Sequence, residues 1–100
     1  MAAHKLVISP AARDDLEEIY QYSCRNWGLL RSSQYLDHIK EQLWCLTQNA
    51  EIGVKRDELL SGVRSVAVAS HVIFYRNQRG QLEVIRVLHG RQDHQLNLKS

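Results

Sequence analysis

A chain of 100 residues with 44% hydrophobic and 24% charged residues has the composition of a folded protein, and we expect one domain over residues 1–100. Its net charge of +2 excludes the dense basic surface of proteins whose affinity comes from neutralising many phosphates. No apolar run approaches the ~20 residues of a membrane span and the N-terminus has no signal-peptide core, so we expect a cytoplasmic protein.

The first predicted elements are a short strand and a long helix. The apolar run Lys5–Ser9 predicts the strand. Ser9 and Pro10 predict a helix start, because serine caps helices and proline fits their first turn. Residues at helical spacing continue to Trp27, where Gly28 can end the helix. We interpret the acidic residues near the helix start as a solvated cluster rather than a catalytic pair: Asp14, Asp15, Glu17 and Glu18.

A second helix is predicted from about Leu30 to Gln48. Its apolar face is formed by residues at three- and four-residue spacing: Leu36, Ile39, Leu43 and Leu46. Because only Gly28 and Leu29 separate the two helices, they must fold back as an antiparallel hairpin. That hairpin does not bring Cys24 opposite Cys45, so we expect two free thiols.

The second half of the chain changes from helical to β patterning. Residues 49–61 form a polar connector without clear periodicity. Three β-rich runs follow, Val63–Ala69, His71–Arg76 and Leu82–Leu88, and Asn77–Gly80 predicts a hairpin turn between the last two. Apolar residues on both faces of the last run indicate a strand with neighbours on each side. We expect the polar tail from residue 90 to be loosely held.

The order of these elements is β-α-α-β-β-β. It predicts an α+β fold, with an antiparallel helical hairpin packed on one face of a small, mostly antiparallel sheet. The other face and the edges of such a sheet stay available for binding, but the architecture alone names no function.

Taken together, these segments resemble the ParE-type toxins of the RelE/ParE toxin–antitoxin superfamily. The similar stretches run in order over nearly the whole chain: Leu6–Ala12, Asp15–Tyr20, Trp27-Gly28, Gly62–Arg64, His71–Tyr75 and Ile85–Asp93. The resemblance implies a toxin that is wrapped and blocked by the C-terminal segment of a cognate antitoxin. It also implies one of two activities, since ParE-type toxins poison DNA gyrase while RelE-type relatives cut mRNA on the ribosome. We favour the gyrase branch; a nuclease, or a non-toxic family member that only forms a complex, is the alternative.

A nuclease of this kind needs an acid, a base and cations around the scissile phosphate. The candidates are Arg64, Arg86 and Arg91 as cations, and His71, Tyr75 and His89 as acid and base. Strand alternation places His71 and Tyr75 on one face, but puts Arg86 and His89 on opposite faces, a restriction that His89 can escape because it lies at the strand exit. Three of these candidates also have a structural interpretation: Arg64 anchors its strand, to Asp57 or Asp93, and the rings of His71 and Tyr75 pack against their neighbours with their polar tips hydrogen-bonded. We therefore expect a binding protein and not an enzyme.

Aromatic residues on the helices are candidates for antitoxin contacts, with core packing as the alternative for each: Tyr20, Trp27, Tyr35 and Trp44. For target binding, the candidates are in the polar segment after the last strand: His89, Arg91 and Asp93. That segment is alternatively a turn held by an Arg91–Asp93 or His89–Asp93 contact. The five histidines are scattered, so we expect no metal and no cofactor. Direct nucleic-acid binding stays an open question.

Overall fold

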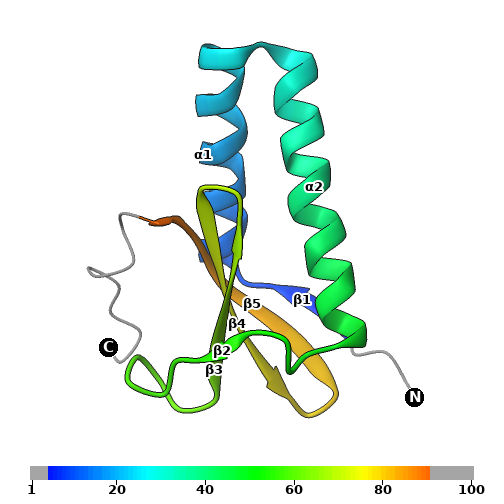
Figure 1. The fold of residues 1–100 in the computed structure, drawn as a ribbon, viewed down its shortest axis with the longest axis vertical. Helices are drawn as coiled ribbons and strands as arrows, with labels where there is room; N and C mark the ends of the chain where they lie inside the picture. Colours follow the sequence, from blue (N-terminus) through cyan, green and yellow to red (C-terminus); the bar gives the residue numbers. More distant parts are fainter. Residues whose placement is uncertain (1–4, 91–100) are drawn as a thin grey trace.

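The computed structural model describes residues 5–90 and has two layers, a helical hairpin and a sheet (Figure 1). The elements in chain order are β1 (Lys5–Ile8), α1 (Pro10–Trp27), α2 (Leu29–Gln48), β2 (Val54–Lys55), β3 (Val63–Val68), β4 (His71–Gln78) and β5 (Gln81–His89). The α+β class and the order of the predicted elements are confirmed. The prediction of an irregular connector over residues 49–61 is wrong in one respect, because this segment contains the two-residue strand β2. Two residues are too few to show an alternating pattern in the sequence.

Both ends of α1 are fixed by residues that the sequence points to. The Ser9 hydroxyl accepts a hydrogen bond from the Ala12 amide at 3.1 Å and donates one to the Ile85 carbonyl at 2.9 Å, which ties the helix start to β5. Gly28 ends the helix with a φ of +87°, where glycine is favoured, and α2 begins at the next residue. The predicted hairpin is therefore confirmed. Cys24 and Cys45 both carry free thiols.

The five strands lie in the order β1-β5-β4-β3-β2. Among the strands of residues 5–90 only the β1–β5 pair is parallel, so the sheet is mostly antiparallel, and β5 has a neighbour on each side as predicted. The turn between β4 and β5 contains Arg79 and Gly80, both with positive φ, which is the geometry of a tight two-residue hairpin. The turn between β3 and β4, at Ala69 and Ser70, lies against the middle of the helical hairpin (Figure 1).

A β-bulge interrupts the β4–β5 pair. Phe74 faces Arg86 and Tyr75 faces Val84, which leaves Ile85 without a partner in the register. A bulge shifts the alternation of side chains beyond it. As a result Val84 and Val87, of opposite parity, both enter the core beneath the helices. Uninterrupted alternation along this strand is therefore wrong at Ile85, and beyond it the odd- and even-numbered residues exchange faces.

The main core lies between the hairpin and the sheet. Its fully or almost fully buried members come from both helices and from the central strands, and include Ala12, Ile39, Leu43, Leu46, Ile73, Tyr75, Leu82 and Val84. The far face of the sheet carries a smaller cluster, in which Leu59 and Leu60 of the loop before β3 pack against Val63, Phe74 and Leu88. That face is therefore partly covered, and not open as the sequence led us to expect. Within residues 5–90 no helix has the length and apolarity to cross a membrane.

Candidate functional site

A row of four rings connects the helical hairpin to the end of the sheet. The Trp27 and Tyr35 rings meet edge to face with centroids 6.1 Å apart. Tyr35 then lies 5.6 Å from His71, and His71 lies 5.5 Å from His89, which faces it across the β4–β5 pair. Two predicted antitoxin contacts and two predicted catalytic candidates are thus brought together in one contiguous surface.

The hydrogen bonding of Tyr35 fixes the orientation of His71. The Tyr35 hydroxyl oxygen lies 2.6 Å from Nδ1 of His71 and 3.4 Å from the carbonyl of Val68, to which it can donate. Burial lowers the pKa of His71 below its ordinary value, and the neighbouring His89 lowers this pKa further. His71 is therefore an uncharged ring at neutral pH, held by α2 at the end of its strand.

A cavity of about 600 Å³ opens beside these rings, between α1 and the end of β5. Its lining includes Trp27, His71 and His89 together with Arg86 and Asp15. Arg86 and His89 keep the opposite parity expected of them, because the register is regular from Arg86 to His89, yet both side chains line this cavity at the end of β5.

Asp15 and Arg86 form an ion pair in the wall of this cavity. The carboxylate of Asp15 accepts hydrogen bonds from Nε and Nη2 of Arg86, at 2.7 and 2.9 Å, and a third from the amide of Val87 at 3.0 Å. The bond to Asp15 raises the pKa of Arg86. The interpretation of Asp15 as part of a solvated cluster is wrong, since Asp15 is buried.

The sequence did contain a signal for this contact. Asp15 comes three residues after Ala12 and four before Ile19, both of which are buried on the same face of α1. A carboxylate at such a position needs a partner, because an unpaired buried charge is costly. The partner could not be identified from the sequence, since it lies 71 residues further along the chain.

Tyr75 and Arg64 hold a loop and lie away from this cavity. Tyr75 is fully buried; its hydroxyl donates to the Ala50 carbonyl at 2.7 Å and accepts from the Gly53 amide at 2.8 Å, while burial raises its pKa. Nη1 of Arg64 donates to the carbonyls of Glu51 and Gly53, at 3.2 and 2.8 Å. A side chain at position 53 would collide with the Tyr75 ring, so only glycine fits there.

Arg64 therefore anchors its strand, but to backbone carbonyls. The expected partner Asp57 accepts instead from the amide of Gly62, at 2.9 Å. Arg64 faces Tyr75 in the register, whereas His89 faces His71. Four residues of strand, or about 13 Å, separate these two positions, so the predicted nuclease residues do not form one group.

The other predicted site residues are dispersed. Tyr20 is half-buried and lines a separate cavity of about 410 Å³ that also includes Ile8 of β1. Trp44 is 60% exposed and Trp27 45% exposed, so the core-packing alternative does not hold for either. Arg91 and Asp93, and the tail to which they belong, lie outside the described residues. Within residues 5–90 no group of three or more histidine, cysteine or acidic side chains is placed to hold a metal ion.

Comparison with known proteins gives consistent similarities. Residues 6–94 match the family described as the ParE toxin of type II toxin–antitoxin system, parDE. Toxin ParE1 of Mycobacterium tuberculosis is 37% identical over 95 residues, which cover 94% of this chain and 97% of that protein. Among solved structures, the fold is similar to the chromosomal ParDE toxin–antitoxin system from P. aeruginosa, with a TM-score of 0.76, 22% identity, and coverage of 87% of this chain and 96% of that chain. The toxin–antitoxin complex RelBE2 from Mycobacterium tuberculosis has a TM-score of 0.65 and 19% identity, with 89% and 93% covered.

Proposed function

This chain belongs to the ParE toxin family of type II toxin–antitoxin systems, and we propose that it poisons DNA gyrase until a cognate antitoxin binds and blocks it. The antitoxin partner is supported by the similar solved structures, which are described as toxin–antitoxin assemblies. The choice of gyrase over mRNA rests on the chemistry of the cavity beside His71 and His89.

The observation that carries this choice is the ion pair between Asp15 and Arg86. RNA cleavage needs cations that stabilise the extra negative charge on phosphorus in the transition state. In this cavity the charge of Arg86 is already compensated by Asp15, and the carboxylate repels an incoming phosphate. Arg64 and Tyr75 are engaged elsewhere, in holding the 50–53 loop. The geometry favours a docking surface over an acid–base site.

The end of the helical hairpin supports a protein as the target. Both helices extend past the sheet, so that their connected ends stand free of it (Figure 1). Large apolar side chains are exposed there: Tyr22, Trp27, Leu29 and Leu30, the last at 75%. Exposed apolar surfaces of this kind mark sites of protein contact.

The alternative function is ribosome-dependent cleavage of mRNA, and one observation favours it. His71 and His89 lie with ring centroids 5.5 Å apart and line the same cavity as Arg86. Two adjacent imidazoles are suitable as the base that deprotonates a 2′-hydroxyl and the acid that protonates the leaving oxygen. Release of Arg86 from Asp15 on RNA binding would supply the cation.

Induced expression of the chain in a bacterium tests the proposal. A gyrase poison stops incorporation of labelled thymidine first, while labelled methionine is still incorporated and mRNA stays intact. Co-expression of the protein encoded by the neighbouring reading frame restores growth. Early loss of methionine incorporation with cut mRNA supports the alternative, and normal growth under full expression rules out both.

A further inference from the structure

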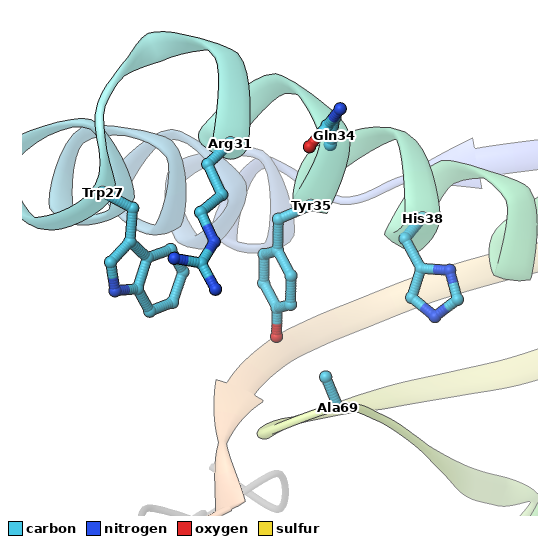
Figure 2. A pocket seen from close by; sticks show the side chains of 6 residues that line it. All are labelled: Trp27, Arg31, Gln34, Tyr35, His38 and Ala69. Atoms are coloured by element: carbon cyan, nitrogen blue, oxygen red, sulfur yellow. The ribbon is translucent and has the colours of Figure 1, made fainter.

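Another cavity, of about 340 Å³, lies beside Tyr35 and shares Trp27 with the cavity that the two histidines line. We call it the Trp27 groove; its lining is Trp27, Arg31, Gln34, Tyr35, His38 and Ala69 (Figure 2). Arg31, Gln34, Tyr35 and His38 recur at three- and four-residue spacing along one face of α2. Trp27 is the last residue of α1, and Ala69 belongs to the β3–β4 turn. Figure 2 shows the side chains of Trp27, Arg31, Tyr35 and His38 directed to the same side of α2. The groove therefore runs along α2 for about two helical turns, from Arg31 to His38.

The walls of the groove are held in place before any ligand binds. Tyr35 packs against the edge of Trp27 and is hydrogen-bonded to His71 at the sheet. The guanidinium carbon of Arg31 lies 5.8 Å from the centre of the Trp27 ring, a cation–π contact. Both aromatic rings have neighbours that fix their orientation. The Trp27 and Tyr35 side chains therefore lose little conformational entropy when a ligand binds.

The charge of the groove has one sign. None of the six lining residues that the structure describes is acidic, and Arg31 is a cation. Trp27 is nevertheless 45% exposed, so a large apolar surface lies directly beside the cation. A complementary ligand combines an apolar side chain with a carboxylate one helical turn away.

We propose that the Trp27 groove binds an acidic amphipathic segment of the antitoxin, with an apolar side chain against Trp27 and Tyr35 and a carboxylate on Arg31. That the partner is the antitoxin rests on the proposed function; the acidic character rests on the groove alone. A protein segment is favoured over nucleic acid, because a single permanent cation and a net charge of +2 give little counterion release. Of the four aromatic residues predicted as antitoxin contacts, Trp27 and Tyr35 line the groove, whereas Tyr20 and Trp44 do not.

The test uses the full chain, labelled with ¹⁵N, and two synthetic helical peptides. Both carry leucines along one face; one has glutamates beside them and the other has lysines at the same positions. A single-stranded DNA oligonucleotide is the third ligand. The Trp44→Phe variant identifies the indole N–H signal of Trp27, and titrations follow this signal together with the Nε–H of Arg31.

The leucine–glutamate peptide is expected to shift both signals. Its affinity should fall about tenfold or more in Arg31→Glu and in Trp27→Ala. Arg79→Glu is the matched control, because it makes the same charge change in the exposed β4–β5 turn, about 26 Å of strand away from the groove. Its affinity should stay within about twofold of the unsubstituted chain.

Three results overturn the inference: equal binding of the lysine peptide, tighter binding of the oligonucleotide at the same signals, or an Arg31→Glu affinity equal to that of Arg79→Glu. Absence of any shift with the glutamate peptide overturns it as well. None of these results touches the toxin function, which the incorporation experiment tests without reference to the groove. Conversely, if the chain binds the acidic peptide and its expression leaves DNA synthesis unaffected, only the gyrase proposal is contradicted.

Discussion

Asp15 in α1 and Arg86 in β5 are joined by two parallel hydrogen bonds, of 2.9 and 2.7 Å, across 71 residues of sequence. The same carboxylate accepts the amide of Val87, next to the bulge. One buried side chain thus fixes the helix, the irregular part of the strand and the only guanidinium that residues 5–90 contribute to the cavity beside His71 and His89. The relationship determines both how α1 is placed and how much positive charge the cavity offers.

Replacement of Asp15 by asparagine should destabilise the fold by about 2 kcal/mol, because it removes the charge that compensates a partly buried guanidinium. Urea unfolding measures the change. Glu83→Gln is the matched control, since the Arg76–Glu83 pair leaves about a third of each side chain exposed and should contribute below ~1 kcal/mol. Equal unfolding free energies for the two variants would contradict the role assigned to Asp15.

Local pattern predicts much of this fold, and the helices show why. Ser9, Pro10 and Gly28 determine where α1 begins and ends through their own conformations, and the apolar stripe of α2 needs no information from distant residues. The short link then forces the hairpin. Strand positions follow in the same way from runs of β-branched and aromatic residues.

The site depended on features that local pattern does not carry. Alternation failed at Ile85 because β5 is apolar on both faces, so that a bulge leaves no trace in its sequence. The partners of Arg64 are backbone carbonyls, which every residue possesses. The contact between Tyr35 and His71 joins residues 36 apart, and only the packing of α2 on the β3–β4 turn brings them together.

Acid should weaken the fold through His71. Its folded-state pKa lies below the ordinary value near 6.5, owing to burial and to His89, so the folded chain binds its proton less readily than the unfolded chain does. The contribution to stability is present above about pH 6.5 and is lost as the pH falls through the folded pKa. The groups that face His71 are Tyr35 from α2 and His89 from β5, with the Asp15–Arg86 pair in the same cavity.

Urea midpoints at about pH 7.5 and about pH 5.5 measure this dependence. His71→Gln keeps a hydrogen-bonding partner for Tyr35 but does not titrate, so its midpoint should fall less than that of the unsubstituted chain. Parallel falls in the two proteins would assign the acid sensitivity to other groups.

Tyr75 should be essential to stability and irrelevant to activity. Tyr75→Phe leaves the Ala50 carbonyl and the Gly53 amide without their buried partner and should cost about 1–3 kcal/mol. Thermal unfolding measures this cost, with Tyr22→Phe as the control because Tyr22 is 59% exposed. Toxic activity per folded molecule should stay unchanged. A large loss of activity at full folding would restore Tyr75 as a proton donor.

The most direct test of the central claim is the supercoiling of relaxed plasmid by purified gyrase and ATP in the presence of this protein. We expect inhibited supercoiling and trapped, cleaved DNA, with at most a few-fold loss of potency in His71→Gln and His89→Gln, because docking requires no proton transfer. The claim is contradicted if gyrase is unaffected while translating ribosomes accumulate mRNA cut in the A site, with each histidine variant about 10²–10⁴-fold slower.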